Sequence, residues 1–249
     1  RELRAGEFRF PAQTSMRGVV GILRHCKTVV RRVTVPEGLS SAQIVALLQQ
    51  TDGLHGEIAT VPAEGSMLPE TYHFSHGDER AVLLSRMADG MRRTLAKLWR
   101  GRAQGLPFIS PEEALILASI VEKETSLEEE RPRIAGVFIN RLRQGMRLQS
   151  DPTVVYGMTL GQKALGRALR RDDLEMLTPY NTYRIPALPP GPIANPGRAA
   201  LSAVLHPRAT KELYFVANGL GGHTFASTFA EHRRNVQQWR RVKARKSRQ

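Results

Sequence analysis

The stretch Ser110-Pro-Glu-Glu-Ala-Leu-Ile-Leu-Ala-Ser-Ile-Val-Glu-Lys-Glu-Thr125 is the part of the sequence that decides the fold. It predicts a helix, because serine is a favoured N-cap, proline is tolerated in the first helical position and glutamate in the third completes a capping pattern. Residues 114–121 are apolar on nearly every side of this helix, so we expect it to be buried. It ends in the charged sequence Glu122-Lys-Glu-Thr125.

Glu124 is the candidate catalytic acid at the end of this helix. On a helical wheel it shares its face with Leu117, Ile120 and Val121. Burial against apolar side chains raises the pKa of a carboxyl group, and the negative end of the helix dipole acts in the same direction. A carboxylic acid that stays protonated near neutral pH is what general-acid cleavage of a glycosidic bond requires.

Two alternatives stay open at this point. The first is that Glu124 forms a structural ion pair with a neighbouring cation, for which the sequence offers Lys123, Arg131 and Arg133. The second is that Glu122 is the reactive carboxylate, although its helical face is smaller and more mixed in polarity.

Around this helix the sequence predicts an α+β fold in three parts. Residues 1–50 form a small module, residues 51–77 a turn-rich connecting segment, and residues 78–249 the larger domain. Within the connecting segment, residues 67–74 are too apolar to lie free, so we expect them to pack. Cap residues and helical spacing predict helices at 15–26, 40–48, 78–104, 132–145, 197–205 and from Phe229 onward. Strands are predicted at 7–10, 28–35, 154–156, 213–217 and 223–226, the last two as a hairpin.

The composition favours a polyanionic partner. The 249 residues carry a formal net charge of +14, and residues 233–249 hold eight basic residues and no acidic one. A nucleic acid, an anionic membrane surface and a carboxylate-rich polymer all fit this charge. Cys26 is the only cysteine, which excludes an intrachain disulfide. The sequence contains no run of about 18 apolar residues, which is the length that would predict a membrane span.

Polar and aromatic side chains in the second half of the chain suit sugar binding through hydrogen bonds and stacking. We name as candidates Gln149, Asp151, Tyr156, Asn181, Tyr183, Asn195 and His223. Asp151 is either a second acid for hydrolysis or the cap of the turn at Pro152. No metal-ligand spacing, nucleotide-binding loop or nucleophile elbow occurs, so no cofactor and no metal site is expected.

Several of these stretches together resemble one family, the YceG-like endolytic murein transglycosylases (MltG). The similar segments run in the same order in both, which makes the resemblance specific. They are residues 64–72, 118–125, 137–143, 145–153, 180–183, 188–191, 194–197, 213–216 and 221–225.

The resemblance implies a role for Glu124 and an organisation of the chain. The second glutamate of Glu122-Lys-Glu-Thr125 corresponds to the catalytic acid of the family. Residues 1–50 correspond to part of a LysM-like module, and residues 78–249 to a mixed α/β YceG-like catalytic domain. The family also implies a single-pass anchor in the bacterial inner membrane, absent from this chain, with the catalytic domain in the periplasm and with cell-wall synthases as partners.

The activity implied is lytic cleavage of peptidoglycan between N-acetylmuramic acid and N-acetylglucosamine within a glycan strand. Glu124 protonates the glycosidic oxygen and then acts as base while the muramoyl C6 hydroxyl closes a 1,6-anhydro ring. The intramolecular nucleophile explains why one carboxylate can suffice where ordinary glycosidases use two. Such cuts would terminate or size nascent strands.

Three rival functions remain. A hydrolase on the same fold would use Asp151 or another acid to activate water. A non-catalytic glycan-binding scaffold of the cell-wall synthesis machinery would not need Glu124. A nucleic-acid binder is not expected, because aromatic residues make up only 6% of the chain and are not interleaved with the basic tail.

Overall fold

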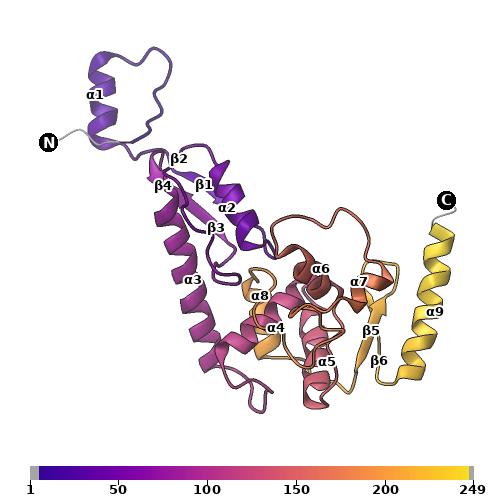
Figure 1. Ribbon diagram of the computed structural model, residues 1–249. Coiled ribbons are helices and arrows are strands. Elements are labelled where there is room, and N and C mark those ends of the chain that lie inside the picture. Colours follow the sequence, from indigo (N-terminus) through magenta and orange to yellow (C-terminus); the bar gives the residue numbers. More distant parts are fainter. Residues whose placement is uncertain (1–5, 247–249) are drawn as a thin grey trace.

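The computed structural model describes residues 6–246 (Figure 1). Its centre is helix α4 (Pro111–Glu124), which begins at the N-cap Ser110, whose hydroxyl accepts a hydrogen bond from the Glu113 N–H at 3.3 Å. The predicted burial is confirmed, since residues 114–121 are all buried apart from Leu115, which is partly buried. Helix α4 packs against α5 (Arg131–Arg143) and α8 (Arg198–Leu205), which also contact each other.

A second, smaller core lies in the N-terminal part. Strand β1 (Arg31–Thr34) pairs antiparallel with β3 (Thr71–Phe74), placing Val33 opposite Tyr72. Helix α2 (Ser41–Gln49) begins at Ser40 with a complete capping box and covers this pair with Ile44 and Leu48. The expectation that residues 67–74 pack is confirmed, because Met67, Leu68, Tyr72 and Phe74 are buried.

Helix α3 (Arg80–Arg100) connects the two cores and confirms the predicted long helix. Leu83 and Met87 near its start belong to the N-terminal core, whereas Met91 and Leu95 belong to the larger one. Val82, which is also apolar, is not part of this buried row and is 54% exposed. It lies one residue before Leu83 and is therefore turned about 100° away from the buried row. The short strands β2 (Leu54–His55) and β4 (Asp78–Glu79) pair in parallel beside the start of α3.

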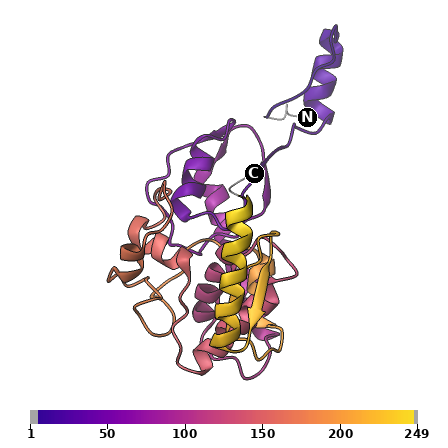
Figure 2. The same cartoon turned by 90° about the vertical axis from the view of Figure 1, so that its right-hand side faces the viewer.

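The first helix stands apart from both cores. Helix α1 (Met16–His25) begins at Ser15 as predicted, and it projects from the body in both views (Figures 1 and 2). None of its residues is buried. The strand predicted at residues 7–10 is wrong: this segment makes one backbone hydrogen bond, from Val29 N–H to Glu7 O, and no neighbouring strand extends the pairing.

Beyond α5 the chain forms two short helices, one hairpin and a last helix. Helices α6 (Asp151–Thr159) and α7 (Arg171–Glu175) are joined by a loop. The strand predicted at residues 154–156 is wrong, because Asp151 and Pro152 start a helix that includes them. Strands β5 (Tyr214–Ala217) and β6 (His223–Ala226) form the predicted hairpin, against which α9 (Phe229–Lys246) packs (Figure 2).

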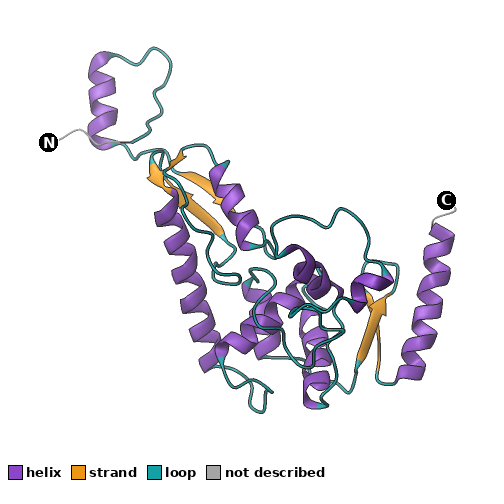
Figure 3. Cartoon of the chain, in the orientation of Figure 1, coloured by secondary structure: helices purple, strands orange, loops and turns teal. Residues whose placement is uncertain are grey.

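The fold is therefore mixed α/β, with far more residues in helices than in strands, and its sheets are three two-stranded pairs among the described residues (Figure 3). Within residues 6–246, no helix combines the length and the apolar character needed to cross a lipid bilayer.

The central position of α4 predicts a large cost for shortening its buried side chains. Leu117 is fully buried in the larger core, so Leu117→Ala should lower the free energy of unfolding by about 3 kcal/mol, measured by urea denaturation. Leu177→Ala is the matched control, because Leu177 is 82% exposed and its truncation should change stability by less than about 0.5 kcal/mol. Equal effects of the two substitutions would contradict the described core.

Candidate active site

Glu124, the last residue of α4, lines a cavity of about 490 Å³. The opposite walls come from the loop before α6, from the loop that carries Tyr183, and from the β5–β6 hairpin. Four of the sugar-binding candidates line the same cavity: Gln149, Asp151, Tyr183 and His223. The fold thus brings together residues that are up to about a hundred positions apart in the sequence.

The environment of Glu124 favours its protonated form. Burial raises the pKa of its carboxyl group to about 7, and the nearby negative charge of Asp151 acts in the same direction. The Ser150 hydroxyl, which donates a hydrogen bond to Glu124 Oε1, and the more distant Arg141 charge lower this pKa. The balance leaves a carboxyl group that can both give up and take back a proton near neutral pH.

The ion-pair alternative for Glu124 is wrong. Arg131 pairs with Glu122 at 3.0 Å and with Glu37 at 3.4 Å. The ammonium group of Lys123 donates to the Gly38 carbonyl at 3.1 Å.

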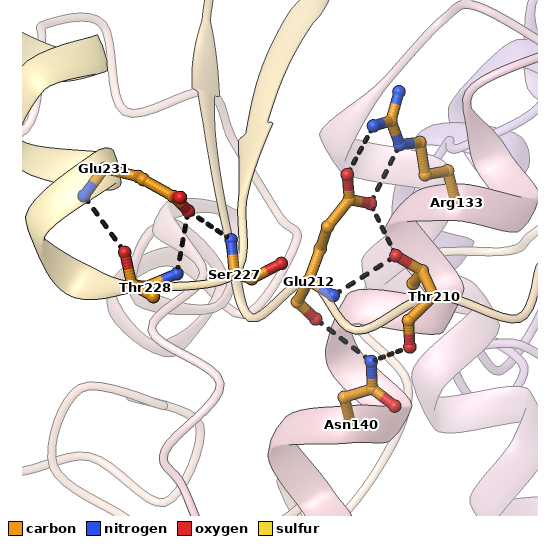
Figure 4. Close-up of polar contacts among 7 residues, drawn as sticks. All are labelled: Arg133, Asn140, Thr210, Glu212, Ser227, Thr228 and Glu231. Carbon is orange, nitrogen blue, oxygen red and sulfur yellow. Dashed lines mark hydrogen bonds and ion pairs between the residues drawn. The ribbon is translucent and has the colours of Figure 1, made fainter.

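The third candidate cation, Arg133, is also engaged elsewhere. Its Nε donates to Glu212 Oε2 at 2.9 Å, on the segment that leads into β5 (Figure 4). Asn140 holds the same segment by donating to the carbonyls of Thr210 at 2.8 Å and Glu212 at 3.0 Å. Arg133 therefore anchors the β5–β6 hairpin to α5, and among the described residues Glu124 has no ion-pair partner.

The same close-up shows how the last helix begins after the hairpin. The Glu231 carboxylate accepts the backbone N–H groups of Ser227 and Thr228, each at 3.1 Å, while the Thr228 hydroxyl accepts the Glu231 N–H at 3.2 Å (Figure 4). This reciprocal cap fixes the direction of α9, whose residues Phe229 and His232 line the cavity.

Glu122, the rival carboxylate, has a structural role. Its side chain is only 4% exposed, and besides the ion pair with Arg131 it accepts the Gly197 N–H at 2.9 Å at the start of α8. Each of its oxygens accepts from a protein donor, so Glu122 connects α4 with α5 and with the start of α8.

The aromatic and acidic residues of the cavity are linked to one another. The Tyr183 hydroxyl donates a hydrogen bond to Asp151 Oδ1 at 2.6 Å, and both residues line the cavity. Gln149, with a positive φ of 53°, accepts from Arg141 through its side-chain oxygen at 3.4 Å. The exposed side chains of Gln149 and Asp151 are therefore placed where a ligand would touch them.

Asn181 and Asn195, also predicted as sugar-binding, are not at the cavity surface. Both are fully buried, and their side chains hold loops in place. Asn181 donates to the carbonyls of Leu174 and Met176. Asn195 accepts from Met67 N–H at 2.9 Å and donates to Glu64 at 2.9 Å, which joins the N-terminal core to the loop before α8. Their amides are occupied by protein partners, so direct contact with a ligand is not supported.

Tyr156 lines a second cavity of about 420 Å³ that adjoins the first. The two cavities share Asp151, and the second is bordered by Gly38 and Ser40 from the N-terminal part. A third hollow of about 350 Å³ shares Glu124 with the first and Lys123 with the second. The three hollows are therefore neighbours, and we refer to them together as the groove.

Sequence reasoning missed Ser150, Arg141 and Glu130. Ser150 and Arg141 both lie in stretches quoted for the family resemblance, but only the folded chain shows that Ser150 is fully buried against Glu124 and that Arg141 lines the cavity. Glu130 contacts His223 at 2.7 Å across 93 residues of sequence, which no local pattern predicts. Within residues 6–246, no three carboxylate, imidazole or thiol groups lie close enough to hold a metal ion.

Comparison with known proteins agrees with this geometry. The YceG-like family matches residues 1–238. An endolytic murein transglycosylase of Bacillus subtilis (strain 168) is 37% identical over 171 residues, which cover 69% of this chain and 46% of that protein. One from Streptococcus pneumoniae serotype 2 (strain D39 / NCTC 7466) is 34% identical over 179 residues, covering 70% and 31%.

A solved structure is similar as well. The crystal structure of a YceG-like protein from Listeria monocytogenes is 31% identical and superposes with a TM-score of 0.68, covering 87% of this chain and 80% of that one. The chain belongs to the YceG-like family. It spans less than half the length of the curated relatives it matches.

The hydrogen bond from Ser150 predicts a measurable change in the titration of Glu124. In the wild type, ¹³C NMR of labelled glutamate should give Glu124 a pKa of about 7. Ser150→Ala removes a donor that stabilises the carboxylate, so this pKa should rise. Ser85→Ala, on the exposed side of α3, is the control and should leave it unchanged. A fall, or no change, in the Ser150 variant would contradict the described contact.

The raised pKa of Glu124 also predicts a pH-dependent stability. A pKa of about 7 in the fold against 4.5 in the unfolded chain means that stability is greatest below pH 4.5 and is lost as the pH rises through 7. The full effect is about 3 kcal/mol. Glu124→Gln cannot ionise, so its free energy of unfolding relative to wild type should increase by about 2 kcal/mol between pH 5 and pH 8.

Urea denaturation at the two pH values measures this difference. Glu129→Gln, at an exposed position five residues further along, shows the effect of removing one surface carboxylate. If Glu124→Gln and Glu129→Gln follow the same pH dependence, Glu124 does not titrate as described.

Proposed function

We propose that this chain carries the catalytic part of an endolytic lytic transglycosylase that cuts peptidoglycan glycan strands, with Glu124 as acid and base. One observation carries the proposal: the groove holds a carboxyl group whose pKa burial raises to about 7, and within residues 6–246 it has no ion-pair partner. The names of the relatives, endolytic murein transglycosylases, support the same substrate class.

In the proposed reaction Glu124 acts first as an acid and then as a base. Glu124 protonates the glycosidic oxygen between N-acetylmuramic acid and N-acetylglucosamine, and the leaving N-acetylglucosamine departs with that proton. The muramoyl C6 hydroxyl attacks the anomeric carbon and gives its proton to the Glu124 carboxylate. The product ends in 1,6-anhydro-N-acetylmuramic acid, and the enzyme returns to its starting state. Ser150 stabilises the carboxylate formed between the two proton transfers.

The groove supports cleavage inside a strand. Neighbouring hollows adjoin the cavity that contains Glu124, which supports the proposal that a polymer lies across the acid without an end in the site. The exposed side chains of Gln149 and Asp151 and the ring of Tyr183 are placed to contact the sugars next to the cut, with Tyr156 further along the groove. The net charge of +14 suits a polymer whose stem peptides and lactyl groups carry carboxylates.

We assign three parts to the chain in this proposal. Residues 1–50 are part of a LysM-like module, residues 51–77 connect it, and residues 78–249 form the catalytic domain. The proposed location is the periplasmic face of the bacterial inner membrane, with a single-pass anchor in the whole protein and cell-wall synthases as partners. Cuts at this place would end or size nascent strands.

Digestion of purified peptidoglycan tests the activity and the residue together. The wild type should release muropeptides with anhydro ends from internal cuts, identified by mass spectrometry. Glu124→Gln should lower the rate by about a thousandfold, because loss of a general acid–base typically costs 10²–10⁴. Glu129→Gln is the matched control and should cut like the wild type.

Other products would change the assignment. Reducing ends, heavier than anhydro ends by one water, would identify a hydrolase in which Asp151 activates water. Equal products from wild type and Glu124→Gln would remove Glu124 from the mechanism. Binding of strands without any cut by either protein would favour a glycan-binding scaffold.

A further inference from the structure

A second carboxylate of the groove region is paired with a histidine and has no part in the mechanism above. Glu130 is the residue before α5, and His223 is the first residue of β6. Glu130 Oε2 lies 2.7 Å from His223 Nδ1, and Glu130 Oε1 accepts the His223 backbone N–H at 2.9 Å. Both oxygens of one carboxylate thus hold one residue, its ring and its backbone.

The residues around this pair are arranged to admit the carboxylate. A Cβ atom on Gly222 would lie 2.7 Å from Glu130 Oε1, so only glycine before His223 lets the carboxylate reach the backbone N–H. The Thr125 hydroxyl, directly after Glu124, contacts Glu130 Oε2 at 3.5 Å. Phe215 packs edge-on against the imidazole, with ring centres 5.3 Å apart. The ring therefore has one fixed orientation.

This orientation leaves the other ring nitrogen for a ligand. An ionised carboxylate only accepts hydrogen bonds, so the Nδ1 that faces Glu130 is the donor, and in the tautomer with one proton, on Nδ1, the other nitrogen Nε2 is an acceptor. Among residues 6–246, Nε2 has no hydrogen-bond partner, and it is also not one of the buried polar atoms without one. It is therefore open to solvent, and His223 lines the cavity that contains Glu124.

We propose that Glu130 is a positioning residue that holds the His223 imidazole so that Nε2 accepts a hydrogen bond from a hydroxyl group of the glycan bound beside Glu124. The identity of the ligand rests on the proposed function, whereas the orientation of the ring does not. A pair with only a structural role would also link β6 to α5. The test therefore has to distinguish this structural link from a hydrogen bond between Nε2 and the ligand.

The variant His223→Asn distinguishes the structural link from the Nε2 hydrogen bond. Its amide N–H₂ can replace the Nδ1 donor toward Glu130, but the side chain ends before the position of Nε2. Glu130→Gln keeps the shape of the partner and removes its charge. His55→Asn is the matched control, because His55 faces Glu79 at 4.0 Å in an exposed pair away from the groove.

Binding of uncut glycan strands is measured first, with every variant built on Glu124→Gln so that no cleavage occurs. His223→Asn should weaken binding about tenfold, the value of one lost hydrogen bond, while its free energy of unfolding stays near that of the parent. Glu130→Gln should weaken binding less, and His55→Asn should not change it. Unchanged binding by His223→Asn would overturn the proposal, because the structural link alone would then be sufficient.

A second measurement does not need a variant of the pair. In ¹H–¹⁵N spectra of the histidine rings, the Nδ1 of His223 should carry the proton and its Nε2 signal should move when glycan strands are added to Glu124→Gln. A ring with its proton on Nε2, or an Nε2 signal that strands do not move, would overturn the proposal. If wild type fails to cut strands but binds them through His223, the proposed cleavage fails and this inference stands.

Discussion

The contact between the Ser150 hydroxyl and the carboxyl group of Glu124 is the interaction on which the rest of the site depends. Burial alone would raise the pKa of Glu124 further and make its carboxyl group a weaker proton donor. The hydroxyl offers the carboxylate one donor, which holds the pKa of Glu124 near 7 instead of higher. The same contact places the start of α6, with Asp151, at the edge of the cavity.

The neighbouring charges are arranged so that this balance is not disturbed. Arg131 and Arg133 lie within ten residues of Glu124 in sequence, yet each has its own carboxylate partner. Asn195 joins the N-terminal core to the larger one, and residues on both sides of this junction line the groove. The stability of the junction and the shape of the groove therefore depend on the same buried polar contacts, whose loss would leave unpaired groups.

The sequence correctly predicted the structural features that depend on residues close together in the chain. The cap at Ser110 and the burial of α4 followed from spacing within one or two helical turns, and the hairpin before α9 followed from the residues of its turn. The strand predicted at residues 154–156 was wrong because β-branched residues were given more weight than the helix start at Asp151 and Pro152. Asn181 was predicted at the sugar because its neighbours are aromatic, but its amide is used to close a turn. The pairing of Glu130 with His223 depends on tertiary contact over 93 residues and has no local signal.

The pH dependence of strand cleavage tests the central claim most directly, since kcat/KM reports the protonation of the free enzyme. If a protonated Glu124 starts the reaction, kcat/KM should decline as the pH rises through about 7, by a factor of about ten per pH unit above it. Ser150→Ala should move this decline to higher pH. A value of kcat/KM that stays constant from pH 6 to pH 9, or that rises, would contradict a neutral carboxyl group as the acid.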